Sequence, residues 1–162
     1  MGSHSFYNLL LDVGYIGMDC RNIDAVILCG GEGTRIRHLL PEGYPKCMAD
    51  VDGVPFLSIL ERHLRGKGFG RFIYCCGYGA ERIMEHLGIE QNEIWQGDRL
   101  VCRYRPDGTG TAIWTALDHI GSDPFVVVNG DTYLDVNYAE MVSRHIQTGS
   151  VATVAIDGEM RN

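Results

Sequence analysis

The stretch from Leu28 to Lys46, LCGGEGTRIRHLLPEGYPK, combines residues that could hold a phosphate chain. Three glycines leave the backbone open to the close approach of an anion and can turn N–H groups toward it. Thr34 adds a hydroxyl, Arg35 a forked donor suited to phosphate oxygens, and Lys46 a compact positive charge. The alternative interpretation is a glycine-rich turn with solvated arginines.

Two familiar phosphate-binding loops do not account for this stretch. The Walker pattern requires Gly-Lys-Ser/Thr after four intervening residues, and the sequence lacks it. The dinucleotide pattern G-x-G-x-x-G would require glycine at position 36, where Ile36 stands. A Gly-Thr-Arg triplet after an apolar run, followed by Pro-Lys, therefore predicts a phosphate loop of another kind.

Two further loops carry residues suited to binding. Asp131 directly follows the apolar run PFVVVNG, where its carboxylate could hold a divalent metal ion that bridges substrate phosphates. The alternative for Asp131 is a turn-forming aspartate. Gly108, Thr109 and Gly110 precede an apolar helix and could approach a base or ribose, or simply form a helix-entry turn. Trp114 in that helix could stack on a base, but core packing is the favoured interpretation.

The composition limits the function classes. The chain has 162 residues and a formal net charge of −7, so a broad nucleic-acid surface is not expected. Arg35, Arg37 and Lys46 concentrate positive charge in this acidic protein. No segment approaches the roughly 20 apolar residues of a membrane span, and the N-terminus does not read as a signal peptide. We expect a cytoplasmic protein without nucleic-acid or membrane partners, whose cysteines are reduced and mostly buried.

Apolar strands alternate with amphipathic helices along the chain. Strands are predicted at 24–29, 71–76, 100–104, 124–129 and 151–156, and helices at 56–65, 80–88, 111–121 and 138–147. The strands are apolar throughout, which predicts a mostly parallel sheet covered by helices on both faces. Ligands of such sheets bind at the carboxyl ends of the strands, where the three loops lie.

The same motifs resemble the sugar-1-phosphate nucleotidyltransferases. LCGGEGTRIRHLLPEGYPK is similar to that family's Leu-x-Gly-Gly-x-Gly-Thr-Arg…Pro-Lys motif, and MADVDGVPFLSILERHL, CCGYGAERI, PDGTGTA and VVVNGDTYLDVN follow in the family's order. The wording is most similar to guanylyltransferases acting on heptose 1-phosphate or mannose 1-phosphate. The resemblance covers about residues 23–156. It implies an α/β, Rossmann-like three-layer sandwich of the nucleotide-diphospho-sugar transferase type.

The resemblance also implies a reaction. The phosphate of a sugar 1-phosphate attacks the α-phosphorus of a nucleoside triphosphate, with GTP expected, and gives a nucleotide-sugar and pyrophosphate. Asp131 would hold Mg²⁺, and Arg35 and Lys46 would stabilise the triphosphate and the leaving pyrophosphate. The implied nucleotide-binding residues are Leu28, Gly30, Gly31, Gly33, Thr34, Gly108 and Thr109. Thr111 stands where the family's motif usually has glycine, so UTP, CTP and dTTP stay open as alternatives.

The organisation of the chain follows from these patterns. We expect residues 1–22 to be an N-terminal extension or tag remnant, and residues 23–162 to be a nucleotidyltransferase core that is C-terminally incomplete. The main alternative to an enzyme is a non-catalytic module that binds a nucleotide or sugar phosphate. An incomplete sheet would expose an edge or an apolar face, which a homo-oligomer would cover.

Overall fold

The computed structural model describes residues 19–89, 95–96, 98–103 and 108–156. Contacts divide the chain into a larger unit, Cys20–Val136, and a smaller unit whose described part is residue 19 with residues 137–156. Predictions for residues 1–18, for Tyr104 and for the side chain of Cys102 fall outside the described residues.

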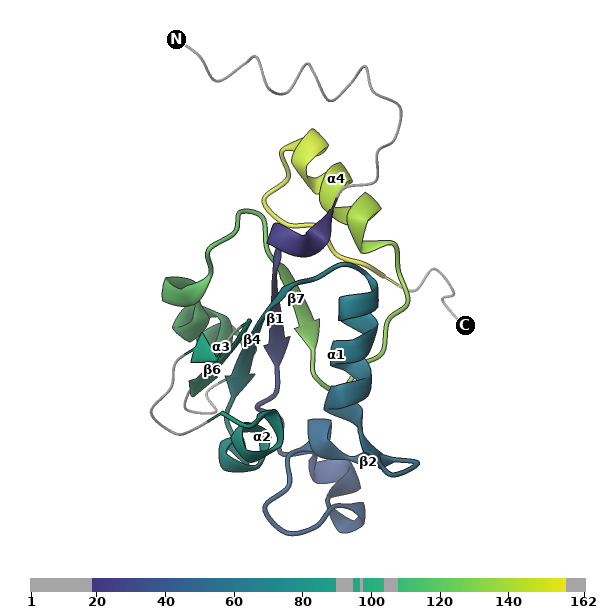
Figure 1. Ribbon diagram of the computed structural model, residues 1–162, viewed down its shortest axis with the longest axis vertical. Coiled ribbons are helices and arrows are strands. Elements are labelled where there is room, and N and C mark those ends of the chain that lie inside the picture. Colours follow the sequence, from purple (N-terminus) through teal and green to yellow (C-terminus); the bar gives the residue numbers. More distant parts are fainter. Residues whose placement is uncertain (1–18, 90–94, 97, 104–107, 157–162) are drawn as a thin grey trace. The chain divides into compact units, whose positions relative to one another are not determined.

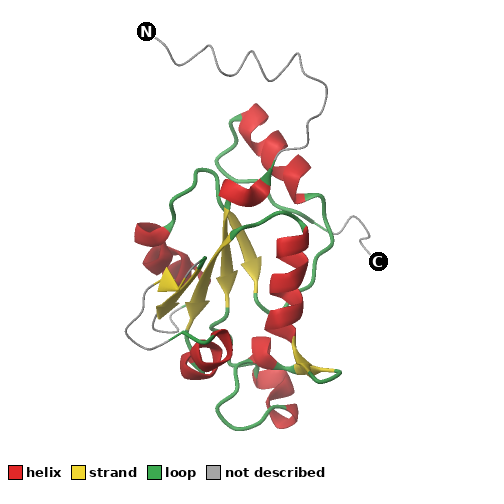
Figure 2. Ribbon diagram, viewed as in Figure 1, coloured by secondary structure: helices red, strands yellow, loops and turns green. Residues whose placement is uncertain are grey.

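The larger unit is built on a five-stranded sheet (Figure 2). Strands β1 (Asp24–Leu28), β4 (Arg71–Cys76), β6 (Arg99–Arg103) and β7 (Val126–Asn129) run parallel. Strand β5 (Trp95–Gln96) pairs antiparallel with β6 at one edge, and the order is β5-β6-β4-β1-β7. The mostly parallel sheet predicted from the apolar strands is therefore confirmed.

Helices and short turns connect these strands. The α-helices of the larger unit are α1 (Phe56–Gly66), α2 (Ala80–Leu87) and α3 (Thr109–Ala116). The remaining elements are the hairpin strands β2 (Asp50–Val51) and β3 (Val54–Pro55) and the 3₁₀ helices η1 (Cys20–Asn22), η2 (Thr34–Leu39), η3 (Lys46–Met48) and η4 (Leu117–His119).

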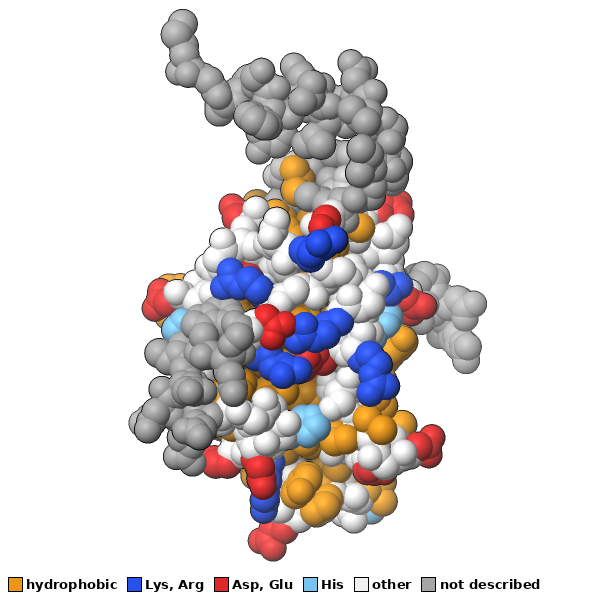
Figure 3. All heavy atoms as spheres, in the orientation of Figure 1, with side chains coloured by type: hydrophobic (Ala, Val, Ile, Leu, Met, Phe, Trp, Pro, Cys, Tyr) orange, Lys and Arg blue, Asp and Glu red, His pale blue; other side chains and the backbone are white. Residues whose placement is uncertain are grey.

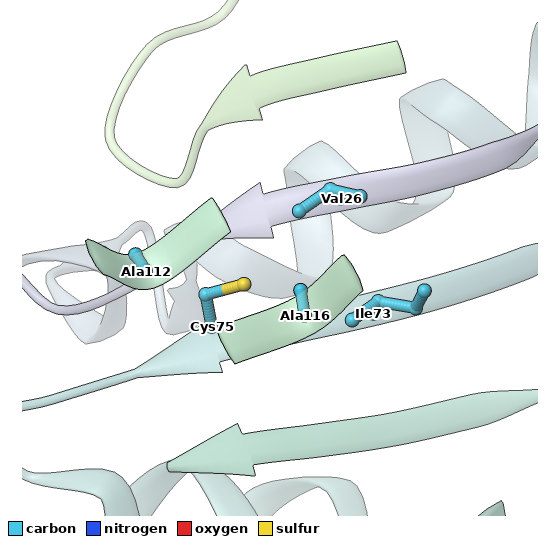
Figure 4. Packing of buried hydrophobic residues seen from close by; sticks show 5 residues of the cluster. All are labelled: Val26, Ile73, Cys75, Ala112 and Ala116. Atoms are coloured by element: carbon cyan, nitrogen blue, oxygen red, sulfur yellow. The ribbon is translucent and has the colours of Figure 1, made fainter. Parts of the chain in front are cut away.

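Helix α3 covers one face of the sheet. Val26 of β1 and Ile73 and Cys75 of β4 form a buried cluster with Ala112 and Ala116 of this helix (Figure 4). The two alanines are one helical turn apart, and their small side chains let the helix lie close to the central strands. Figure 1 shows α1 and α3 on either side of β1 and β4.

Helix α1 lies on the opposite face of the sheet, and its buried Glu61 carboxylate contacts a strand there. Tyr74 stands between Ile73 and Cys75 in β4, so its side chain points away from α3. The Tyr74 hydroxyl donates to Glu61 Oε2 of α1 at 2.5 Å, and Glu61 is only 6% exposed. The larger unit is thus an α/β three-layer sandwich, as predicted.

The outer side of α3 differs from the sequence-based expectation. Trp114 is 76% exposed, so the favoured interpretation of core packing is wrong. Each helical residue turns by about 100°, so Trp114 lies about 200° around the axis from Ala112, which faces the sheet. The helix begins at Thr109, two residues before the predicted start, and continues as the 3₁₀ helix η4.

The smaller unit contains one described helix, α4 (Tyr138–Thr148). The backbone N–H of Glu140 donates to Asn137 Oδ1 at 3.2 Å, so the Asn137 side chain caps the start of the helix. The strand predicted at 151–156 is wrong, because no strand is assigned there and the apolar side chains are exposed: Val151 102%, Val154 76% and Ile156 84%. An apolar segment becomes a strand only when a neighbouring strand takes its backbone hydrogen bonds, and the described part of this unit contains none.

The described cysteines Cys20, Cys29, Cys47, Cys75 and Cys76 are buried thiols, as predicted. On the face shown in Figure 3, Lys and Arg side chains lie among Asp and Glu side chains. Among the described residues, no helix combines the length and the apolar character that crossing a membrane would require.

Candidate functional site

One pocket of about 260 Å³ lies where three loops of the larger unit meet. Its walls come from the two ends of the connection between β1 and η3, from the start of α3 and from the turn after β7. Leu28 of β1 is in register with Asn129 of β7, which brings the ends of both strands to the same edge of the sheet. The pocket therefore lies at the carboxyl ends of parallel strands, where ligands of α/β sheets bind.

Most of the predicted site residues line this pocket: Leu28, Gly30, Gly31, Lys46, Gly108, Thr109 and Asp131. The structure does not bring Gly33, Thr34 and Arg35 into its lining, because they lie one turn further along, at the start of η2. Sequence reasoning missed four lining residues, namely Cys29, Cys47, Asn129 and Gly130. Cys29, Cys47 and Gly130 each adjoin a predicted residue, and Asn129 lies two positions before Asp131, so proximity in the sequence was the available signal.

Lys46 and Asp131 form the electrostatic centre of the pocket. Lys46 Nζ donates to Asp131 Oδ2 at 2.6 Å, and Thr132 Oγ1 donates to Asp131 Oδ1 at 3.2 Å. Partial burial on its own would raise the pKa of Asp131, but the Lys46 ammonium and the Thr132 hydroxyl outweigh this and lower it. The carboxylate is therefore ionised at neutral pH and presents a negative charge beside the lysine.

The stretch from Leu28 to Lys46, here called the signature loop, requires glycine where it passes Lys46. Gly33 has φ of 64°, and a Cβ added there would lie 2.8 Å from Lys46 Cβ. The Lys46 backbone N–H also donates to the carbonyl of Gly31 at 3.4 Å. The main chain and Cβ of Lys46 are thus held by the loop, while the side chain reaches the pocket.

A tight turn after β7 places Asp131. The Gly130 N–H donates to the Leu28 carbonyl at 2.9 Å, and a Cβ on Gly130 would lie 2.8 Å from that oxygen. The Thr132 N–H donates to the Asn129 carbonyl at 3.3 Å and closes the turn. The two loops that carry the opposite charges therefore share a backbone contact that only glycine permits.

Arg37 makes its contacts within the loop between β1 and η3. Its guanidinium carbon lies 4.2 Å from the centroid of the Tyr78 ring. Its Nη1 donates to the carbonyls of Glu32 at 3.3 Å and Tyr44 at 3.4 Å. Arg37 therefore joins the beginning and the end of the signature loop. The side chain of Arg35, by contrast, is exposed and makes no hydrogen bond or ion pair with the residues that the structure describes.

The segment that follows the β7 turn is fastened to α1. The Tyr133 hydroxyl lies 2.9 Å from His63 Nδ1, and the two ring centroids are 4.3 Å apart. His63 Nε2 lies 3.1 Å from the Leu134 carbonyl. A neutral histidine with its proton on Nε2 satisfies both contacts, donating to the carbonyl and accepting from the hydroxyl. An exposed ion pair between Lys67 Nζ and Asp135 Oδ1, at 2.6 Å, adds a third attachment.

Replacing His63 by alanine should lower the free energy of unfolding by about 1–2 kcal/mol, since two hydrogen bonds are lost. Urea denaturation of the purified chain measures this change. Arg62→Ala, an exposed neighbour on the same helix, serves as the control and should stay within about 0.5 kcal/mol of wild type. Equal stability of the two variants would contradict an attachment through His63.

The carboxylate of Asp131 suits a metal ion that is shared with a substrate. The described ranges contain no group of three or more His, Cys, Asp and Glu that could hold an ion by themselves. Mg²⁺ usually retains several waters and binds one or two protein carboxylates together with substrate phosphates. An ionised, partly exposed carboxylate at the edge of a pocket fits that requirement.

Two proteins with similar sequences are named as a guanylyltransferase and a uridylyltransferase. The D-glycero-alpha-D-manno-heptose 1-phosphate guanylyltransferase of Aneurinibacillus thermoaerophilus is 34% identical over 134 residues, 83% of this chain and 57% of that protein. The UTP–glucose-1-phosphate uridylyltransferase AglF of Haloferax volcanii is 30% identical over 137 residues, 83% of this chain and 54% of that protein.

A solved structure has a similar fold. The crystal structure of HddC from Yersinia pseudotuberculosis complexed with GMP-PN superimposes with a TM-score of 0.65 and 33% identity, covering 76% of this chain and 54% of that one. The chain thus spans about half the length of the relatives that it matches. The family model described as "Nucleotidyl transferase" matches residues 24–162, which include every described pocket residue. The chain therefore belongs to the nucleotidyl transferase family.

Proposed function

We propose that this protein transfers a nucleotidyl group from a nucleoside triphosphate to a sugar 1-phosphate and releases pyrophosphate. The observation that carries the proposal is the contact of 2.6 Å between Lys46 and Asp131 in a pocket lined by Gly30 and Gly31. A cation for phosphate, an anion for a metal ion and an open backbone are brought together there. The names of the relatives support the two substrate classes.

The chemistry needs charge more than proton transfer. The attacking sugar phosphate is already an anion, so the nucleophile requires no general base. The barrier comes from bringing two anions together and from the charge that builds up on the leaving pyrophosphate. We assign Lys46 to the phosphates inside the pocket and Arg35, on the exposed turn beside it, to the outer end of the triphosphate. Gly30 and Gly31 leave room for a phosphate to approach the main chain.

Magnesium is the cofactor that we infer for Asp131. When bound, Mg²⁺ supplies charge neutralisation between phosphate oxygens, which a single lysine cannot provide. The part of this chain is to hold the ion through the Asp131 carboxylate, which the turn at Gly130 fixes at the end of β7. Asn129 lines the same pocket.

We infer that GTP is the triphosphate. This rests on the guanylyltransferase name of one relative and on the GMP-PN of the HddC complex. The uridylyltransferase AglF makes UTP the second candidate. Gly108 and Thr109, at the start of α3, are the residues that we assign to the base or ribose. We also place the protein in the cytoplasm, where nucleoside triphosphates occur and thiols such as Cys29 stay reduced.

Pyrophosphate release tests the proposal directly. The full-length gene product is incubated with Mg²⁺, each nucleoside triphosphate in turn and a panel of sugar 1-phosphates that includes heptose and mannose derivatives. Release with GTP and one sugar phosphate is the expected result. A rise in melting temperature with GTP, without release for any sugar phosphate, would contradict the enzyme and indicate a binding module.

Arg35→Ala should lower kcat/KM by roughly 5- to 30-fold, or about 1–2 kcal/mol. This is less than the value for a fully enclosed charged donor, because Arg35 is exposed and outside the pocket lining. The free energy of unfolding of the Arg35→Ala variant should equal that of wild type. Arg37→Ala is the matched comparison: it should lower stability by about 1 kcal/mol through the loop contacts of Arg37. An Arg35→Ala protein with wild-type kcat/KM would contradict the role of Arg35.

A further inference from the structure

We propose that Lys46 and the divalent metal ion compete for the same carboxylate, so that substrate binding is an exchange of partners at Asp131. The inference rests on the proposed function and deepens it, because it describes how the site takes up its metal. In this view Lys46 has two positions. It neutralises Asp131 before substrate binds, and it turns to a phosphate when the metal–nucleotide complex arrives.

Both carboxylate oxygens of Asp131 already have partners within the chain. Oδ2 accepts from Lys46 Nζ at 2.6 Å, which leaves no room for an ion between them, and Oδ1 accepts from Thr132 Oγ1 at 3.2 Å. Mg²⁺ requires its oxygen ligands at about 2.0–2.1 Å. An ion that binds Oδ2 must displace the ammonium, and one that binds Oδ1 lies within a few ångströms of it. Either position is opposed by the charge of Lys46.

The backbone of Lys46 is fixed, whereas the end of its side chain can move. Its backbone donates to Gly31, and its Cβ faces Gly33 so closely that a second Cβ would not fit. Its side chain is 38% exposed, and the four-carbon stem can rotate toward Gly30 and Gly31, which line the same pocket. Exchange therefore needs a change of side-chain rotamer and no movement of the loop.

The charges make metal and nucleotide depend on each other. A metal ion alone would take Asp131 and leave the Lys46 ammonium unpaired beside a divalent cation. A nucleotide alone would take Lys46 and leave the Asp131 carboxylate facing phosphate oxygens. The metal–nucleotide complex re-pairs both side chains at once, so each ligand should raise the affinity for the other. The same pairing makes the site reject free divalent ions.

The test measures binding of Mn²⁺, a paramagnetic substitute for Mg²⁺, by the electron paramagnetic resonance of the free ion. Without nucleotide, Lys46→Met should bind Mn²⁺ roughly 5- to 30-fold more tightly than wild type, because a positive charge near the ion has been removed. Lys46→Arg keeps the charge and should keep the weak affinity. With a non-hydrolysable GTP analogue present, the wild type should gain Mn²⁺ affinity and Lys46→Met should gain little.

Lys67→Met is the matched control. Lys67 also pairs with an aspartate at 2.6 Å, with Asp135 as its partner, but neither residue lines the pocket. The variant removes the same net charge and should leave Mn²⁺ affinity unchanged. Chemical denaturation of each variant confirms that it is folded, and Lys46→Gln replaces Lys46→Met if that variant is unstable.

The outcomes separate this inference from the proposed function. Tighter Mn²⁺ binding by Lys46→Met, with binding lost in Asp131→Asn, supports the exchange. Unchanged affinity in Lys46→Met, with binding still lost in Asp131→Asn, overturns the exchange and leaves the metal assignment standing. Wild-type Mn²⁺ binding by Asp131→Asn overturns both.

Discussion

Replacing Asp131 by asparagine or alanine should abolish pyrophosphate release in the full-length gene product, with a loss of more than roughly 10³-fold, or about 4 kcal/mol. Asparagine keeps the shape of the side chain and can still accept from Thr132, but it removes the negative charge that the proposed metal ion requires. Lys46 also loses its ionic partner at 2.6 Å. One substitution therefore removes the charge of Asp131 and leaves the Lys46 ammonium without its ionic partner in the pocket.

The fold should survive this change. The side chains of Lys46 and Asp131 are 38% and 37% exposed, and a pair so open to water contributes at most about 1 kcal/mol to stability. Asp135→Asn is the control, because it breaks an ion pair of the same length four residues further along and outside the pocket. It should retain full activity. Wild-type turnover by Asp131→Asn at saturating Mg²⁺ would rule out Asp131 as the metal ligand.

The fold could be predicted where burial alone decides the local structure. Strands buried on both faces must be apolar, so the apolar runs around Val26 and Ile73 predicted strands. Helices with one apolar side were predicted from the helical spacing of their apolar residues. The prediction at 151–156 failed because an apolar run satisfies only one requirement of a strand. The other requirement is a neighbouring strand that takes its backbone hydrogen bonds, and the sequence of the segment does not specify that neighbour.

The site could be predicted as loops but not as contacts. The glycines and charges of the signature loop indicated phosphate binding, and the position of Asp131 after β7 indicated a metal ligand. The approach of Asp131 to Lys46 joins residues that are 85 positions apart, and no local pattern specifies it. The sequence grouped Arg37 with Arg35 by charge. The structure separates them, because Tyr78 and two carbonyls hold the Arg37 guanidinium away from the pocket.

Replacing Glu61 by glutamine should lower the free energy of unfolding by about 3–5 kcal/mol, a large part of the 5–15 kcal/mol typical of a domain. Glu61 Oε1 accepts from Arg65 Nε at 2.8 Å and from Arg99 Nη2 at 2.7 Å, and Oε2 accepts from Tyr74 at 2.5 Å. Glutamine has nearly the same volume, so no cavity forms. Its amide group carries no charge and presents hydrogen atoms to donors that need an acceptor.

The size of the loss depends on how far water can replace the missing charge. The side chains of Arg65 and Arg99 are 36% and 35% exposed, which lets solvent screen part of their charge. Arg65 also keeps Asp98, at 2.6 Å from its Nη1. The lower end of the range is therefore expected. Tyr74 is fully buried beneath α1, so its hydroxyl has no such compensation.

The pH dependence of stability gives a second measurement of the same group. Burial on its own would raise the pKa of Glu61, but hydrogen bonds from Arg99, Tyr74 and Arg65 outweigh it and lower the pKa below its ordinary value of 4.5. The folded state therefore holds the proton less tightly than the unfolded state. The stability that the charge contributes is present above about pH 4.5 and is lost as the pH falls through the folded-state pKa.

Urea denaturation at pH 7 and at pH 3.5 should thus show a wide gap between wild type and Glu61→Gln at the higher pH and a narrower one at the lower. Glu85→Gln provides the control, since Glu85 is 73% exposed and pairs with Arg82 at 3.1 Å on the surface of α2. That variant should differ from wild type by less than about 0.5 kcal/mol at pH 7. A gap for Glu61→Gln that is equally wide at both pH values would mean that shape and packing hold α1 against the sheet, and that the charge of Glu61 does not.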